Sequence, residues 1–218
     1  MREYERRRAL DESRVDAKKQ SIQTFFGDGF VGKVASFLAV DDSPRLSTNV
    51  WAQGAVGEER VAARLDALAE VGVVSLHDRR IPGTRANIDH LAVTPWGVWV
   101  IDAKRYLNKR PERLIEGGFF GFGGTARLLV GGRKKDDLVY GVQRQIDKVQ
   151  AELGPQIQVR GILCFVDGEW PLIGGDFSVR GVRVLWPRRL AKELLQTIPP
   201  IIDPEAVSRR LAAKFPPA

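Results

Sequence analysis

The sequence has very few of the residues from which metal centres and disulfide frameworks are usually built. Its 218 residues include one cysteine, Cys164, and two histidines, His77 and His90. A single cysteine excludes an intrachain disulfide framework, and this set is too small for a zinc site of the usual cysteine and histidine type. We expect a reducing, cytoplasmic location, because the chain has no disulfides to maintain.

Long apolar runs are also missing. The most apolar early stretch, residues 21–40, is interrupted by Asp28 and Lys33, so it falls short of the roughly 20 apolar residues that cross a bilayer. A charge-rich segment precedes it, unlike the start of a secretory signal. We therefore expect no transmembrane segment. A helix over residues 30–40 could pack on the protein or lie on a membrane surface, and packing is favoured.

The charge that is present favours an anionic partner. The chain has 34 Lys and Arg against 27 Asp and Glu, a net charge of +7. Residues 104–148 hold eleven of these cations and five acids, so this segment alone carries +6. It predicts a basic ribbon that binds nucleic acid, although a merely solvated face remains the alternative. The predicted contacts are Arg105, Lys109, Arg110, Arg113, Arg127, Arg133, Lys134 and Lys135.

The order of periodic segments predicts a mixed α/β fold with three regions: an N-terminal helical arm (1–50), a core domain (51–186) and a C-terminal helical tail (187–218). Within the core we expect helices at 55–70 and 137–153, and strands at 73–76, 87–93, 98–104, 159–166 and 182–186. An inserted hairpin is expected between 113 and 132. The strands at 98–104 and 159–166 should run parallel, because a helix connects them.

Two aspartates should face each other on the hairpin formed by 87–93 and 98–104. If Val93 pairs with Val98 across the intervening turn, Asp89 lies opposite Asp102, and Lys104 follows on the same face. Directly opposed carboxylates repel each other. This arrangement therefore predicts a cation between them.

A third carboxylate is predicted to join this pair from the first helix. On a helical wheel Glu58 lies in the middle of the apolar face formed by Val61, Leu65 and Ala69. Burying an unpaired carboxylate is costly, so Glu58 should have a partner, either a metal or Lys104. Carboxylate oxygens suit magnesium, which can polarise a phosphate and activate water. The lysine could orient that water or stabilise charge on the phosphate.

These segments resemble a known family. Residues 57–61 (GEERV), 87–91 (NIDHL) and 95–104 (PWGVWVIDAK) are similar to the nuclease-related domain, a member of the PD-(D/E)XK restriction-endonuclease-like superfamily. The similarity covers roughly residues 54–166. It implies a restriction-endonuclease-like mixed sheet flanked by helices, in which Asp89 and Asp102 bind Mg²⁺ or Mn²⁺, Lys104 assists the water, Glu58 completes the metal site, and Gln145 adds a glutamine from the later helix. Many members have Glu where this chain has Asp102, and the wider superfamily accepts either residue.

The favoured function is therefore hydrolysis of phosphodiester bonds in nucleic acid, with DNA preferred over RNA. The main alternative is a catalytically silent module of the same fold that binds nucleic acid through the basic ribbon. A third is a membrane-associated or assembly protein that uses the 30–40 helix and the phenylalanines at 119, 120 and 122. Oligomeric state and the choice between endo- and exonuclease action stay open.

Overall fold

The computed structural model describes residues 50–117, 123–171, 175–195 and 200–218. The predicted arm up to residue 49, including the 30–40 helix, lies outside the described residues, as does the hairpin tip with its three phenylalanines.

A six-stranded mixed sheet forms the centre of the molecule, in the order β1-β2-β3-β7-β9-β8. The predicted parallel pairing of β3 with β7 is confirmed, and β2 runs antiparallel to β3. The strands span Val74–Arg80 (β1), Asn87–Thr94 (β2), Gly97–Arg105 (β3), Val159–Val166 (β7), Phe177–Val179 (β8) and Val182–Leu185 (β9). This mixed α/β architecture is the one expected of a restriction-endonuclease-like fold.

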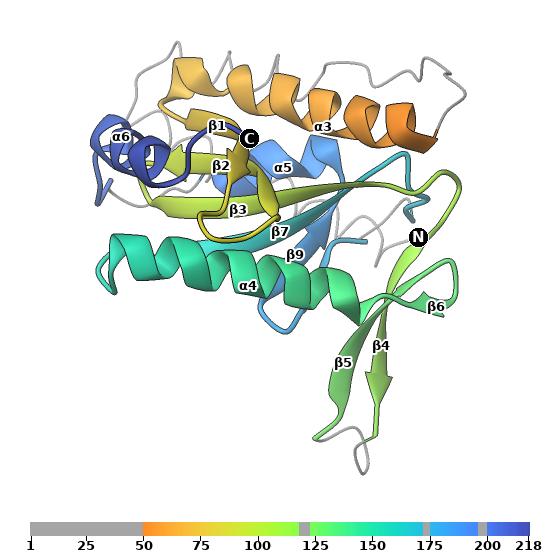
Figure 1. The fold of residues 1–218 in the computed structure, drawn as a ribbon. Coiled ribbons are helices and arrows are strands. Elements are labelled where there is room, and N and C mark those ends of the chain that lie inside the picture. The colour runs from red at the N-terminus through yellow and green to blue at the C-terminus, as the bar shows by residue number, and fades with distance from the viewer. Residues whose placement is uncertain (1–49, 118–122, 172–174, 196–199) are drawn as a thin grey trace, which may run out of the picture.

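Helices cover both faces of this sheet (Figure 1). α3 (Val50–Asp66), the short η1 (Ala69–Val71) and α5 (Pro187–Leu194) pack on one face, and α4 (Asp136–Leu153) and α6 (Pro204–Lys214) pack on the other. Strand residues alternate between the two layers, so β3 sends Trp99 and Ile101 toward α3 and Val100 toward α4. No helix in the described ranges is long and apolar enough to cross a membrane.

α4 lies very close to β7, and a glycine allows this. A Cβ atom at Gly161 would stand 2.6 Å from side-chain atoms of both Val142 and Ile146. A larger residue at this position would push the helix away from the sheet. The predicted crossover helix therefore packs directly against the strand that it precedes.

A second, three-stranded antiparallel sheet projects from the main body (Figure 1). It consists of β4 (Pro111–Glu116), β5 (Thr125–Val130) and β6 (Arg133–Lys134), which confirms the inserted hairpin predicted for residues 113–132. Leu128 and Val130 are buried and anchor its base in the core, whereas Leu114 and Ile115 are exposed.

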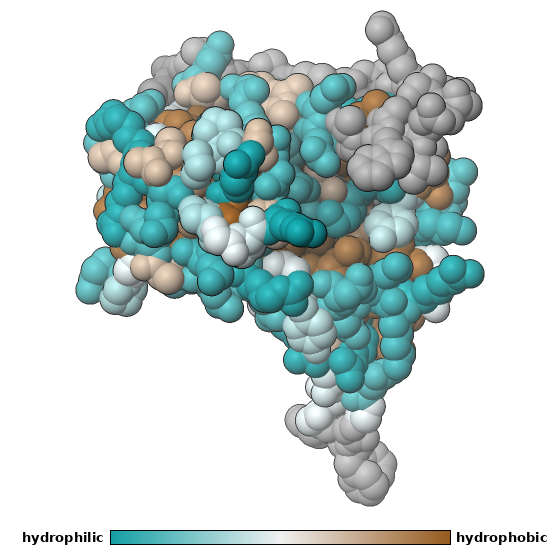
Figure 2. Space-filling view, viewed as in Figure 1, coloured by the Kyte–Doolittle hydropathy of each residue, from teal (hydrophilic) through white to brown (hydrophobic). Residues whose placement is uncertain are grey.

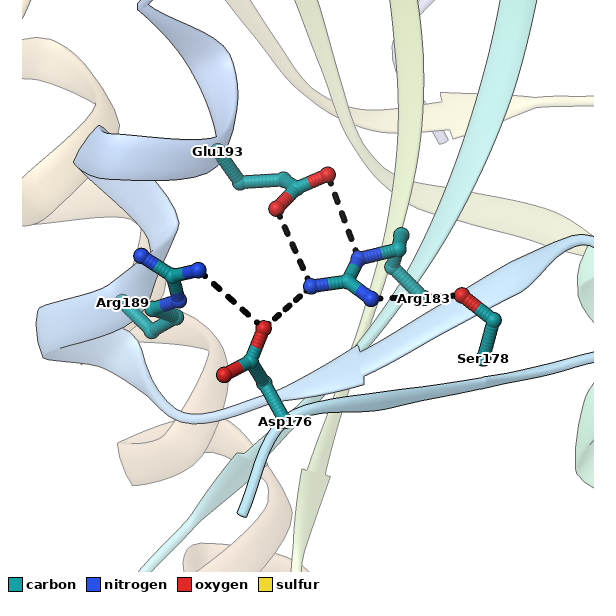
Figure 3. A network of polar contacts seen from close by, with 5 residues as sticks. All are labelled: Asp176, Ser178, Arg183, Arg189 and Glu193. Carbon is teal, nitrogen blue, oxygen red and sulfur yellow. Dashed lines mark hydrogen bonds and ion pairs between the residues drawn. The ribbon is translucent and has the colours of Figure 1, made fainter. Parts of the chain in front are cut away.

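An ion-pair network fixes α5 to the far edge of the central sheet (Figure 3). Arg183 of β9 pairs with Asp176 and, through Nε, with Oε1 of Glu193 at 3.2 Å. Asp176 also accepts a hydrogen bond from Arg189 of α5 at 3.2 Å. One aspartate thus holds two arginines, an arrangement that recurs at Asp167.

The structure differs from the sequence-based expectation at β1 and β8. β1 continues to Arg80, four residues past the predicted end, because its later residues pair with β2 instead of entering a loop. β8 was not predicted, since three residues after a glycine pair give too short a pattern. The extension of β1 brings His77 and Asp78 into the sheet.

Candidate active site

Backbone pairing between β2 and β3 stops before the strands end, and Asp89 lies just beyond the last pair. The predicted register is confirmed for Val93 with Val98 and Leu91 with Val100, but backbone pairing stops at His90 and Ile101. Beyond this pair the backbone N–H of Ala103 donates to Oδ2 of Asp89 at 3.0 Å. The carboxylate of Asp89 is thereby fixed between the two strand ends.

Lys104 lies against oxygen atoms from three residues. Its Nζ forms a short ion pair with Oδ1 of Asp102, lies 3.4 Å from the carbonyl oxygen of Ala103, and is 3.9 Å from Oδ2 of Asp89. Asp102 is only 7% exposed, so this ammonium is its main charge partner. The structure therefore places a positive charge where two carboxylates and a backbone carbonyl converge.

The surroundings of Asp89 change its protonation. Burial raises the pKa of Asp89 to about 7, and the charge of Asp102 and a hydrogen bond with its side chain act in the same direction. Lys104 and the backbone N–H of Ala103 oppose this rise. Burial lowers the pKa of Lys104, but Asp102 and Asp89 outweigh it, so the net shift is upward. When no further cation is bound, the side chain of Asp89 is therefore about half protonated near neutral pH.

Asp89→Asn should stabilise the metal-free protein. With a pKa of about 7 in the folded state against 3.8 normally, Asp89 is ionised above pH 7 at the full cost to stability; this cost shrinks as the pH falls below 7 and the folded state takes up a proton, and it is gone only below about pH 3.8. Asn removes the charge and can still accept from Ala103. We expect the variant to melt several degrees higher than the wild type at pH 8, and the gap to shrink toward pH 5. The exposed Asp137→Asn is the control, and a lower melting temperature for Asp89→Asn would contradict this assignment.

The prediction for Glu58 needs correction. Its side chain is exposed, not core-facing, because α3 here passes over charged strand ends instead of the apolar core that receives Val61 and Leu65. Partial burial and the charge of Asp89 raise its pKa, while Lys104 lowers it, so Glu58 is an electrostatic neighbour of the pair. No three Asp, Glu, His or Cys side chains in the described ranges gather closely enough to hold a metal ion. In the structure Glu58 is thus an exposed neighbour of Asp89 and Lys104.

Gln145 of α4 lies beside the start of β2. Its Nε2 donates to the carbonyl oxygen of Asn87 at 3.1 Å, two residues before Asp89, and its Oε1 is buried without a hydrogen-bond partner. Gln143 of the same helix donates to the carbonyl oxygen of Arg180. The helix thus brings one glutamine to the edge of the site and directs the other away.

Comparison with known proteins adds a decisive observation to this geometry. The sequence-family model of the nuclease-related domain matches residues 53–166. This range is more than half of the chain and includes every residue of the candidate site. This chain belongs to the nuclease-related domain family. Searches among curated proteins and among solved structures gave no match.

The predicted basic ribbon of this nuclease-related domain is reduced by internal ion pairs. Arg105 has a side chain that is 2% exposed and pairs with Asp167 at 2.7 Å, so it is not available to a ligand. Arg127 pairs with Glu116 and Asp136, and Lys134 also pairs with Glu116. Strand pairing places the side chains of Arg127 and Lys134 on one face of the hairpin.

The remaining ribbon cations are exposed or half-buried. Arg113 and Arg133 lie on the same face of the hairpin, because they pair with Leu128 and Val130, which are two residues apart on β5. Figure 2 shows the stem of the hairpin as mainly hydrophilic surface. The candidates that are left for nucleic-acid contact are Lys109, Arg113, Arg133 and Lys135, since Arg110 pairs with Glu112 at 3.4 Å.

The two histidines of the nuclease-related domain form a hydrogen-bonded chain behind the site. Nδ1 of His77 lies 2.9 Å from Nδ1 of His90, and Nε2 of His77 lies 2.8 Å from Oδ1 of Asp66 on α3. His90 is buried, and its Nε2 has no hydrogen-bond partner. His90 is thus a buried residue of β2, and His77 lies opposite it in β1.

This burial predicts acid sensitivity. Desolvation lowers the pKa of His90 to about 4, below the usual 6.5, so the unfolded chain binds a proton that the folded protein resists. Stability contributed by neutral His90 is complete above pH 6.5 and is lost as the pH falls toward 4. Relative to His90→Gln, the wild type should lose about 2–3 kcal/mol of unfolding free energy between pH 7 and pH 4.5. Urea titrations at the two pH values measure this difference, and a pH-independent difference would disprove it.

Two acidic residues near the site were missed by the sequence analysis. Asp78 of β1 accepts a hydrogen bond from Asn87 at 3.1 Å, and its charge contributes to the raised pKa of Glu58. Asp167 directly follows β7 and holds Arg60 and Arg105. The position of Asp167 at the end of a strand parallel to β3 was a usable signal, because the ends of such neighbours meet at one edge of the sheet.

Proposed function

We propose that this chain is a metal-dependent nuclease that hydrolyses phosphodiester bonds, with DNA as its favoured substrate. One observation carries the proposal: in a member of the nuclease-related domain family, the ammonium of Lys104 lies against oxygens of Asp102, Ala103 and Asp89. These atoms combine a cation with two carboxylates whose own repulsion calls for positive charge.

The same atoms fit a hard divalent ion. Mg²⁺ is typically held by one or two carboxylates together with waters and substrate phosphates, so Asp89 and Asp102, with the carbonyl of Ala103, form a suitable donor set. Mg²⁺ or Mn²⁺ is therefore the proposed cofactor. When bound there, it supplies polarisation of the phosphate and a water of lowered pKa.

The protein's own groups have distinct tasks in this proposal. Lys104 holds its proton, since its pKa is raised, and its ammonium can orient the attacking water and stabilise negative charge that builds on the phosphate. Glu58, at the rim, can accept a hydrogen bond from a water of the site. Gln145 keeps the start of β2 in place through Asn87 and offers its unpaired Oε1.

We further propose that the exposed arginines of the hairpin, Arg113 and Arg133, contact phosphates. Reversing two of its charges, Arg113→Glu with Arg133→Glu, should weaken DNA binding for every sequence tested, because phosphate contacts position a substrate without reading it. The slope of log affinity against log salt should fall by about 0.9 for each duplex phosphate contact that is lost. Lys192→Glu with Arg209→Glu makes the same change in net charge on other elements and should leave the slope unchanged. Equal slopes in the wild type and both variants would show that Arg113 and Arg133 form a solvated surface that does not contact phosphates.

The proposed activity is tested with purified protein and linear, circular and single-stranded DNA. Cleavage should require Mg²⁺ or Mn²⁺ and should stop when EDTA is added. The silent-module alternative draws support from the short Asp102 and from the exposed position of Glu58; it is favoured if DNA binds but stays intact with both metals. RNA of the same sequence, in parallel, tests the preference for DNA.

The cytoplasm is the location we propose, because the sequence has a single cysteine, the buried Cys164, and therefore no intrachain disulfide that would need an oxidising compartment.

A further inference from the structure

We propose that Asp167 is a positioning residue for the candidate active site, tying the helix that carries Glu58 to the strand end that carries Lys104. The inference rests on the proposed nuclease function for its catalytic meaning, whereas the tie itself is a property of the fold.

Asp167 binds one arginine through each carboxylate oxygen. Its Oδ1 pairs with Nη1 of Arg60 at 2.6 Å, and its Oδ2 pairs with Nε of Arg105 at 2.7 Å. The three side chains are 16%, 18% and 2% exposed, so water screens these pairs much less than it screens surface ion pairs. Asp167 also has a positive φ of 60°, a backbone conformation that turns the chain immediately after β7.

Both arginines are adjacent to residues of the site. Arg105 directly follows Lys104 on β3 and points to the opposite face, toward α3. Arg60 lies on α3, two residues after Glu58. A single carboxylate at the end of β7 thus joins the two elements that supply Glu58 and Lys104.

The helix and the strand are also in close contact at this point. A Cβ atom at Gly57 would lie 3.3 Å from Cβ of Arg105, so glycine lets α3 approach β3 one residue before Glu58. Close packing permits the approach, but it does not hold two guanidinium groups together. The carboxylate of Asp167 provides the opposite charge that does.

Removal of that charge should have a local effect. Without it, two guanidinium groups face each other with little access to water, and Nη1 of Arg105 is already buried without a partner. The later part of α3 stays anchored, because Val61 and Leu65 are fully buried in the core. We therefore expect the beginning of α3, with Glu58, to move away from Lys104 while the rest of the fold persists.

The molecule contains its own matched control. Asp176 likewise bridges two arginines, Arg183 and Arg189, and its side chain is 17% exposed against 16% for Asp167. It ties α5 to β9 and touches no residue of the candidate site (Figure 3). Asp176→Asn therefore reproduces the loss of a two-arginine carboxylate without disturbing Glu58 or Lys104.

The experiment compares full-length wild type, Asp167→Asn, Asp167→Glu and Asp176→Asn by hydrogen exchange and by single-turnover cleavage of DNA. Amide exchange in residues 56–60 should accelerate in Asp167→Asn, remain slow in Asp176→Asn, and be partly restored in Asp167→Glu. Cleavage per folded molecule should fall about 10- to 100-fold in Asp167→Asn, since small misplacements of catalytic groups have effects of this size. Asp176→Asn should cleave like the wild type.

A double-mutant cycle separates positioning from general stability. If Asp167 acts through Glu58, Glu58→Gln should reduce cleavage strongly in the wild type and little in Asp167→Asn. Full additivity, or equal loss in Asp176→Asn, would overturn the positioning role. If the wild type does not cleave DNA, the proposed function fails, and the exchange data alone decide: unchanged protection of residues 56–60 in Asp167→Asn would overturn the tie as well.

Discussion

Lys104→Ala is expected to lower the rate of DNA cleavage by about 10²–10³-fold, the usual loss when one electrostatic stabiliser of a transition state is removed. The ammonium of Lys104 contacts Asp102 and lies near Asp89, so its loss leaves two carboxylates without their cation. The folded protein can respond by holding a proton on Asp89, whose pKa is already raised. We therefore expect the variant to fold, with the loss confined to the chemical step.

Single-turnover cleavage at saturating protein measures this effect, and a thermal melt on the same sample verifies folding. Lys192→Ala is the control, because Lys192 is an exposed lysine on α5. Wild-type turnover by a folded Lys104→Ala protein would remove Lys104 from the mechanism.

Asp102→Asn should have an equal or larger effect and should reduce cleavage to background. Asp102 is 7% exposed, and Asn has nearly the same shape, so the substitution removes a charge without creating a cavity. It takes away one of two proposed metal ligands and the ion-pair partner of Lys104. Asp137→Asn, at an exposed position in the first turn of α4, makes the same chemical change elsewhere.

Raising the metal concentration distinguishes two explanations of that loss. If Asp102 binds the ion, cleavage by Asp102→Asn should partly return at high Mn²⁺. If cleavage by this variant equals that of the wild type at every concentration, Asp102 has no role in the reaction.

Local sequence rules were sufficient to predict the part of the site that lies on one hairpin. The turn between Val93 and Val98 determines the register up to His90 and Ile101, and Asp89, Asp102 and Lys104 lie together just beyond this pair. These rules did not predict that backbone pairing stops at His90. Beyond it, the side chain of Asp89, and not a backbone carbonyl, accepts the hydrogen bond from the N–H of Ala103.

Residues whose roles depend on distant segments were harder to predict. A helical wheel assigned Glu58 to the apolar face, but its side chain is exposed, because the wheel contains no information about where the sheet beneath that face ends. Arg105 was counted as part of a basic ribbon, yet Asp167, 62 positions later in the chain, neutralises it. Charge counted along a sequence therefore overestimates the charge that a ligand meets.

The central claim is that Asp89 and Asp102 bind a divalent ion together, and calorimetric titration with Mn²⁺ tests it most directly. The wild type should bind Mn²⁺ saturably at pH 7.5 and release protons as it does so, because the ion displaces the proton that Asp89 partly retains at a pKa of about 7. Asp89→Asn and Asp102→Asn should each weaken binding by at least about tenfold. If the wild type does not bind Mn²⁺, or if both variants bind it with wild-type affinity, Asp89 and Asp102 do not form a metal site.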